Sequence, residues 1–351
     1  LDLFDPACTF STSVPHLAIR NAGLMNAILA LSCYHLSLVQ NSSIDERPSP
    51  NTALQYYYQT LHYVQKAMRY STYQTSHELM ATTLIVSTYE MLRESRKDWE
   101  RHLQGVFWIL RSRQINVEIS GLESTTWWAW LRQDIWAAFR EKRRTYTTWT
   151  PKKSYSELTA YEVASRAVWI LAQVINFCAR ESDTESQSAI SSQFETARVL
   201  RNMLHEWRSH LTTAFSPLPA RNRPGSEGFQ PLLIHPPCFG LAMQIHHVSQ
   251  IMILVHEPSN GGIEFFKQRQ KTIQRSIEVV CGIGMTLTDD ASSLVSSQCL
   301  FIAGMFTRDS QQRKSILDML DLCRQRCGWP THPLGAELEQ IWDESHLSPK
   351  D

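Results

Sequence analysis

The spacing of apolar residues is the feature that most limits what this chain can fold into. Apolar side chains recur every three or four positions along most of the chain, which places them on one face of a helix. No segment alternates apolar and polar residues between hairpin turns, as a half-buried strand would. The spacing predicts an all-α fold, a large irregular array of roughly eleven or twelve helices with no significant sheet.

The helical segments differ in length and share no fixed period, so a named solenoid repeat is not predicted. Pro15 suits the first turn of the first helix. Two Ser/Thr-x-x-Glu capping boxes, Thr159 with Glu162 and Ser192 with Glu195, predict the starts of two later helices. The apolar stripes lie at 15–40, 54–68, from 76 onward, 99–110, 128–138, 159–177, 192–211, 241–255, 266–280, 295–306, 316–323 and 338–342.

Residues 1–351 are expected to form a single domain with one internal junction. The segment 216–237 holds six prolines together with Gly225 and Gly228 and shows no periodicity, which is typical of a long irregular crossing. It predicts two lobes, 1–215 and 238–351, joined by this proline-rich segment.

The charge balance argues against direct nucleic-acid binding by these residues. Thirty-four lysines and arginines balance 34 aspartates and glutamates, whereas a surface that grips phosphates usually has a basic excess. The longest apolar stretches, such as 251–255, are interrupted by His or Gln well short of a membrane span, so no membrane contact is expected. Eight scattered cysteines fit reduced thiols in an intracellular protein. A start without methionine suggests a cut inside a longer chain.

The sequence contains no complete motif for catalysis, cofactor binding or metal binding, so no enzyme activity is predicted. Gly282-x-Gly284 lacks the third glycine and the strand–helix context of a dinucleotide site. His246 and His256 are too far apart to pair as zinc ligands on one helix, and Cys323 with Cys327 has no second cysteine pair nearby. Core or rim histidines and buried cysteines are the favoured interpretation, and no catalytic residue, metal or cofactor is assigned.

Polar side chains at two expected helices form the candidate site. Arg101 and His102 begin one helix beside Trp99, and Arg132 with Asp134 interrupts a tryptophan-rich helix. A structural network that bridges packed helices explains them most simply, since buried charges need partners, and a ligand-facing role is the alternative. The tryptophans of this helix allow the same two interpretations. A place in the core is the favoured one, and the wall of a pocket is the alternative, for positions 127, 128, 130 and 136.

One basic patch follows the tryptophan helix. A solvated helix end explains it, because cations are favoured near helix C-termini, and a contact with acidic peptides or DNA flanks is the alternative. Its members are Arg140, Lys142, Arg143, Arg144, Lys152 and Lys153.

Specific residues along nearly the whole chain resemble the fungal-specific transcription factor domain, which is found behind six-cysteine binuclear zinc clusters. The most specific motif is Trp127-Trp-Ala-Trp-Leu-Arg-Gln-Asp-Ile-Trp136. Further matches are Leu3-Phe-Asp5, Phe10, Pro15-His-Leu-Ala18, Leu24-Met-Asn-Ala-Ile-Leu-Ala-Leu-Ser32, His35-Leu36, Tyr89-Glu-Met-Leu92, Trp99-Glu-Arg-His-Leu-x-Gly105, Phe139-Arg-Glu-Lys-Arg143, His235-Pro-Pro237, His256-Glu-Pro258, Gly262, Gly328-Trp-Pro330, Pro333-Leu334 and Trp342.

The resemblance implies a helical regulatory domain in the nucleus that contributes to control of RNA polymerase II transcription. It implies contacts with the transcription machinery or coregulators, a possible homodimer and a possible small-molecule effector. The Cys-x-x-Cys-x6-Cys pattern is missing from the sequence, so zinc and DNA contact are expected only through an upstream module. A stand-alone relative that acts as a small-molecule carrier or enzyme in fungal metabolism, and a dimeric scaffold, are the alternatives.

Overall fold

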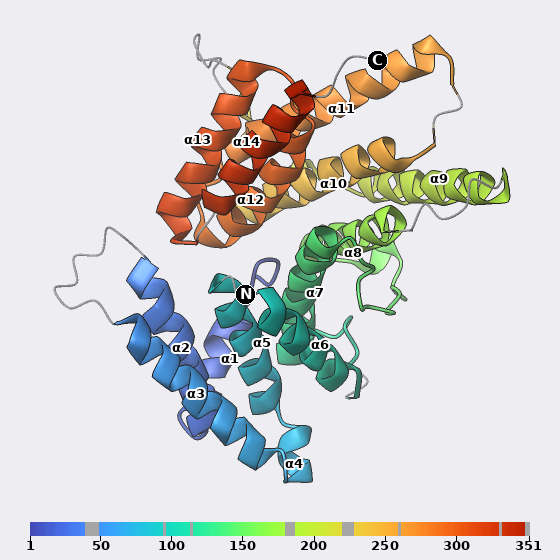
Figure 1. The fold of residues 1–351 in the computed structure, drawn as a ribbon. Coiled ribbons are helices and arrows are strands. Elements are labelled where there is room, and N and C mark those ends of the chain that lie inside the picture. The colour runs from blue at the N-terminus through green and yellow to red at the C-terminus, as the bar shows by residue number, and fades with distance from the viewer. Residues whose placement is uncertain are drawn as a thin grey trace. The chain divides into compact units, whose positions relative to one another are not determined.

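Helices are the only regular secondary structure in the described part of the chain, which has no strand, as the sequence predicts (Figure 1). The structure, a computed structural model, describes residues 1–38, 49–93, 96–112, 115–179, 187–219, 228–258, 261–329 and 332–347, without the side chains of 96–102, 112, 187–189, 332 and 345–347. Its α-helices are α1 (Thr9–Ala18), α2 (Ala22–Leu38), α3 (Pro50–Ala67), α4 (Ser71–Gln74), α5 (His77–Leu92), α6 (Arg96–Ser112), α7 (Leu122–Glu141), α8 (Ala160–Cys178), α9 (Gln187–Ser209), α10 (Pro237–His256), α11 (Ile263–Gly284), α12 (Asp290–Met305), α13 (Ser310–Cys327) and α14 (His332–Leu347), with short 3-10 turns η1 (Tyr155–Glu157) and η2 (Thr213–Phe215).

Fourteen α-helices in these residues slightly exceed the eleven or twelve expected. The single helix predicted over 15–40 is two helices, because the chain turns at Ile19 to Asn21 and the Asn21 side chain caps α2 by accepting a hydrogen bond from the Leu24 N–H at 2.9 Å. Pro15 therefore lies inside α1 and not in the first turn of a long helix. The four-residue α4 is the other addition.

The two predicted capping boxes have different outcomes. Thr159 and Glu162 form a reciprocal pair at the start of α8, with N–H to side-chain distances of 3.3 and 2.8 Å, which confirms the first. The second prediction is wrong, because α9 already begins at Gln187 and Ser192 lies within it. Glu195 instead makes two hydrogen bonds with Arg198, one turn further along the helix.

Two compact units divide the chain, and their sequences interleave. Unit 1 comprises 1–137, 146–153 and 328–330, and unit 2 comprises 138–145, 154–327 and 331–351. In unit 1, α5 is buried along most of its length and packs on α1, α2 and α6. Trp130 of α7 is fully buried in this unit and donates its indole N–H to the Leu103 carbonyl at 3.2 Å. Burial of these faces stabilises unit 1.

Unit 2 is built around α10, the helix that the sequence places at the centre. It packs on α8, α9, α11 and α12, and its side chains are buried from Phe239 to Ile253 with one exception, Gln250. Contrary to the sequence expectation, α10 is long and apolar enough to cross a membrane by length and composition. Most of it is packed inside unit 2, as in the core helix of a globular protein.

The predicted lobes, 1–215 and 238–351, have other bounds than the compact units and stay a prediction. α8 and α9 precede the proline-rich segment, and both pack on α10, which follows it. The described part of that segment crosses α11 closely, because the Leu232 N–H donates to the Gly282 carbonyl at 2.8 Å. A Cβ at Gly282 would lie 2.4 Å from the Gln230 carbonyl oxygen, so this crossing requires glycine.

Candidate ligand pocket

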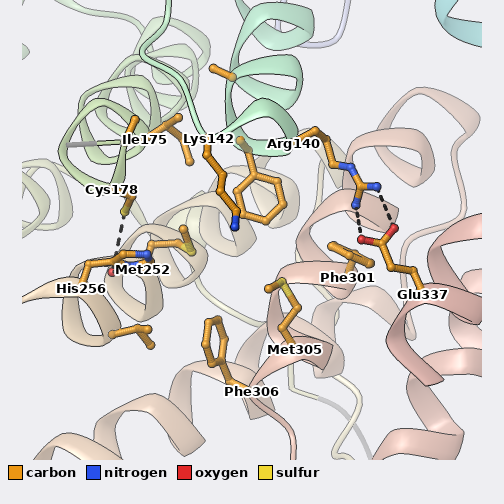
Figure 2. A pocket seen from close by; sticks show the side chains of 14 residues that line it. Arg140, Lys142, Ile175, Cys178, Met252, His256, Phe301, Met305, Phe306 and Glu337 are labelled. Carbon is orange, nitrogen blue, oxygen red and sulfur yellow. Dashed lines mark hydrogen bonds and ion pairs between the residues drawn. The ribbon is translucent and has the colours of Figure 1, made fainter. Parts of the chain in front are cut away.

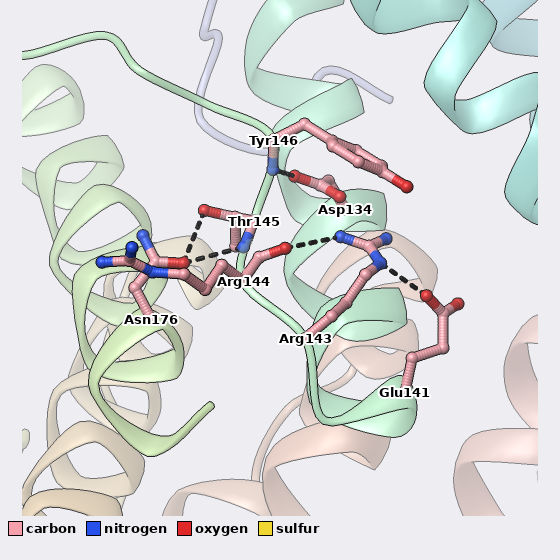
Figure 3. A network of polar contacts seen from close by, with 7 residues as sticks. All are labelled: Asp134, Glu141, Arg143, Arg144, Thr145, Tyr146 and Asn176. Carbon is pink, nitrogen blue, oxygen red and sulfur yellow. Dashed lines mark hydrogen bonds and ion pairs between the residues drawn. The ribbon is translucent and has the colours of Figure 1, made fainter. Parts of the chain in front are cut away.

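The predicted site residues on α7 contact the main chain. Arg132 donates to the Leu1 carbonyl at 2.6 Å, and burial lowers its pKa to about 10, against the opposing effect of Asp2. Asp134 is fully buried and accepts a hydrogen bond from the Tyr146 N–H at 2.7 Å (Figure 3). Arg101 and His102 lie on α6, but their side chains lie outside the described residues. The four-residue network therefore stays a prediction.

The turn that follows α7 is held by its own polar contacts (Figure 3). In unit 2, the Thr145 N–H and hydroxyl both donate to the Asn176 side-chain oxygen, at 2.7 and 3.1 Å. Arg143 pairs with Glu141 at 2.5 Å and donates to the Arg144 carbonyl at 2.9 Å. These contacts fix the path of the chain directly after α7 and engage part of the predicted basic patch locally.

Lys142 occupies an unusual backbone position at this turn. Its φ is 54°, in the left-handed region where glycine is the usual residue. The Arg143 N–H donates to the Ala138 carbonyl at 3.0 Å, and the Lys142 N–H donates to the Phe139 carbonyl at 3.4 Å. This pair of bonds is a Schellman motif, which ends α7.

A pocket of about 530 Å³ lies in unit 2, directly beside this turn (Figure 2). Its volume is within the range of small-molecule sites. The walls are mainly apolar and come from the last turns of α7, α8, α10 and α12, and from α14. The lining residues are Ala138, Phe139, Arg140, Lys142, Ile175, Cys178, Ala179, Met252, Val255, His256, Phe301, Met305, Phe306 and Glu337.

Charged groups stand at the edge of this apolar pocket. Arg140 makes a bidentate ion pair with Glu337, with N–O distances of 2.8 and 2.7 Å, and its guanidinium lies 5.4 Å from the centre of the Phe301 ring. The Lys142 ammonium points toward the middle of the lining side chains (Figure 2). The described residues place no carboxylate within ion-pair distance of this ammonium.

The remaining polar groups in the pocket favour binding over covalent chemistry. Burial raises the pKa of the Cys178 thiol to about 12, which keeps it protonated and weakly nucleophilic. His256 lies 2.8 Å from the Met252 carbonyl through Nδ1, which therefore carries the proton. The pocket thus offers apolar surface, two cationic side chains and one carboxylate.

The adjacent histidines of α10 lie in the core, as the sequence interpretation favours. Burial is the main cause that lowers the pKa of His246 to about 3 and of His247 to about 4. His246 stacks on Trp207, with ring centres 5.1 Å apart, and His247 lies 3.3 Å from the Ser276 hydroxyl. No group of three possible metal ligands occurs among the residues that the structure describes.

The pocket was not predicted from the sequence, although some of its signals were visible. The spacing of apolar residues predicts that the stripes containing Met252 and Phe306 face the core. Arg140 and Lys142 were noted as part of a basic helix end. The pocket forms where several helix ends come together in space. The spacing of apolar residues in the sequence does not tell which helix ends do so.

Comparison with known proteins finds a family match in the amino-terminal part of the chain. Residues 3–149 match the family model of the fungal specific transcription factor domain. The match confirms the family resemblance noted in the sequence. The matched range contains α1 to α7 and the tryptophan motif, and it largely coincides with unit 1. Most pocket residues, from Ile175 to Glu337, lie beyond it.

One curated relative extends the similarity past this domain. The chain is 22% identical to the transcription activator AMTR1 of Alternaria alternata over 343 aligned positions, which cover 77% of this chain and 44% of the relative. The chain thus spans less than half the length of that relative. No solved structure matches the chain.

Proposed function

We propose that this chain is the regulatory and interaction part of a fungal zinc-cluster transcription factor that acts in the nucleus on RNA polymerase II transcription. The fungal specific transcription factor domain over residues 3–149 and the similarity to a transcription activator support this role. The balance of 34 basic and 34 acidic residues supports regulation rather than DNA contact by these residues. DNA is then read by a separate zinc cluster, with coregulators and a second copy of the chain as partners.

We further propose that the unit 2 pocket receives a small-molecule effector. The observation that carries this proposal is an apolar pocket of about 530 Å³ whose edge carries Lys142 without a described counter-charge. An effector that occupies the pocket contacts the ends of four helices and stabilises one arrangement of them. Such a preference is the physical requirement for regulation by a ligand.

A reporter assay tests both parts of the proposal. The chain is fused to an unrelated DNA-binding domain in yeast, and reporter output is measured for the wild type and for Ala179→Phe, which places a ring inside the pocket. Ala291→Phe is the matched control, because Ala291 is exposed on α12 and does not line the pocket. We expect a clear output from the wild type, a changed output from Ala179→Phe, and an unchanged output from the control.

The outcomes separate the proposals. A fusion with no effect on the reporter contradicts the regulatory role. If Ala179→Phe is folded by circular dichroism and gives the same reporter output as the wild type, the effector site is contradicted.

The same pocket also supports the second candidate, a small-molecule carrier of fungal metabolism. A carrier binds its ligand, yet its fusion leaves reporter output unchanged. An upstream six-cysteine cluster in the full-length message contradicts the carrier and supports the transcription factor.

A further inference from the structure

We propose that the unit 2 pocket selects small molecules with an apolar body and a single carboxylate, and that Lys142 binds the carboxylate. This inference rests on the proposed effector site and names the chemical class of its ligand. It follows from the backbone conformation at Lys142, the ion pair between the other charged groups, and the hydrogen bonds that the carbonyls at the surrounding helix ends already accept.

The backbone at Lys142 directs the only cation of the lining that has no described carboxylate partner into the pocket. A lysine with φ of 54° is unfavourable relative to glycine, and such positions concentrate at functional sites. The Schellman bonds to Ala138 and Phe139 hold this conformation, and in Figure 2 the ammonium ends among the apolar side chains. Glycine at this position would end the helix as well but would leave the pocket without this charge.

The other strong charges in the lining neutralise each other. Arg140 and Glu337 form a bidentate pair, so this pair contributes little net field to a bound molecule. One positive charge therefore remains at Lys142. Lys142 is exposed at the edge of the pocket, and the half-buried apolar side chains of Met305 and Phe306 also line it, so a bound anion can contact the charge and the apolar wall together.

The helix ends around the pocket oppose the attraction of Lys142 for an anion. The last turns of α7, α8, α10 and α12 each carry a partial negative charge, which favours a cationic ligand. Many of these carbonyls already accept hydrogen bonds from the protein. His256 lies 2.8 Å from the Met252 carbonyl, and the Trp342 indole donates to the Gly304 carbonyl at 2.9 Å. Lys142 carries a full positive charge, whereas each helix end carries only a partial negative one. The pocket therefore prefers an anionic ligand over a cationic one.

A calorimetric titration with three ligands of equal tail tests the inference. Dodecanoate and dodecyltrimethylammonium, each below its critical micelle concentration, and dodecan-1-ol, below its solubility limit, present a carboxylate, a cationic and a neutral head group. We expect the purified wild-type chain to bind dodecanoate about tenfold more tightly than dodecan-1-ol, because one hydrogen bond to a charged group contributes about 1.5 kcal/mol or more. The cationic ligand should bind most weakly.

Substitution at Lys142 assigns the preference to this residue. Lys142→Asn removes the charge, and asparagine tolerates the left-handed region, so the turn is retained. It should bind the acid and the alcohol equally, with the affinity for the alcohol unchanged, which shows that the pocket is intact. Lys142→Arg should keep the preference for the acid. Lys314→Asn, at an exposed lysine of α13 outside the pocket, should behave as the wild type.

Each outcome decides between the proposals. Equal binding of acid and alcohol by the wild type, or tighter binding of the cation, overturns the carboxylate inference and leaves the effector pocket standing. Failure of all three ligands to bind overturns this inference, whereas the regulatory role stands or falls on the reporter assay. A preference for the acid that survives Lys142→Asn overturns the assignment to Lys142.

Discussion

Replacement of Gly282 by alanine tests the close crossing between α11 and the segment before α10. An added Cβ would lie 2.4 Å from the Gln230 carbonyl oxygen and 3.1 Å from the Leu232 side chain. The backbone oxygen cannot rotate away, so the crossing segment must move and strain its hydrogen bond from the Leu232 N–H to the Gly282 carbonyl, 2.8 Å long. Overpacking costs about 1 to 3 kcal/mol, and a lost hydrogen bond costs about 1 kcal/mol.

Helix propensity acts in the opposite direction, because alanine stabilises a helix interior by about 1 kcal/mol relative to glycine. We therefore expect Gly282→Ala to lower the free energy of unfolding by about 1 to 3 kcal/mol. Gly105→Ala is the matched control, since Gly105 is also helical and its Cβ would meet nothing within 4 Å, so this variant should be more stable than the wild type.

Urea unfolding followed by far-ultraviolet circular dichroism measures both changes. The expected result is a lower midpoint for Gly282→Ala and a higher midpoint for Gly105→Ala, with slopes close to that of the wild type. A Gly282→Ala protein that is as stable as the wild type would refute the reasoning. In that case, the segment at Gln230 would not be fixed against α11.

Three further predictions concern polar side chains. Asp134→Ala should lower the free energy of unfolding by about 1 to 3 kcal/mol in urea melts, because the Tyr146 N–H loses its acceptor, and equal stability would contradict this. Thr159→Ala should cost about 1 kcal/mol through the lost cap of α8, and an unchanged urea midpoint would exclude that role. The chain should lose stability as the pH falls from 6.5 toward 4, by up to about 1.4 kcal/mol per pH unit for each of His246 and His247. The pKa values of these histidines are lowered in the folded state, so only the unfolded state takes up protons in this pH range. The double variant to glutamine should show a flatter pH dependence of the urea midpoint, and an unchanged slope would contradict burial of these side chains.

Local signals in the sequence predict the individual helices well. The apolar stripe from Leu241 to Val255 identifies α10 and its central place, and Thr159 with Glu162 marks the start of α8. The break before α2 was missed because Asn21 interrupts a region whose apolar spacing suggests one helix. These features depend on neighbours within one or two turns, which is the range that spacing reports.

The pocket depends on contacts between distant parts of the sequence and could not be predicted in the same way. Lys142 is in a basic stretch that spacing alone assigns to a helix end, and its left-handed backbone has no sequence signal, because glycine is the usual residue there. Arg140 meets Glu337 across 197 positions. Gly282 could not be explained from the sequence either. Gly282-x-Gly284 is only an incomplete dinucleotide motif, and the packing role of Gly282 is visible only in the structure.

The interleaving of the two units determines how the protein can be dissected. A fragment that stops at Ala137 lacks 146–153 and 328–330 of unit 1, and a fragment that begins at 138 carries these pieces without the rest of that unit. A cut there also divides α7 and exposes four carbonyls that had bonded within the helix. A truncation near residue 137 would therefore report the disruption of both units and not the location of an activity, and full-length proteins with single substitutions are the appropriate tools.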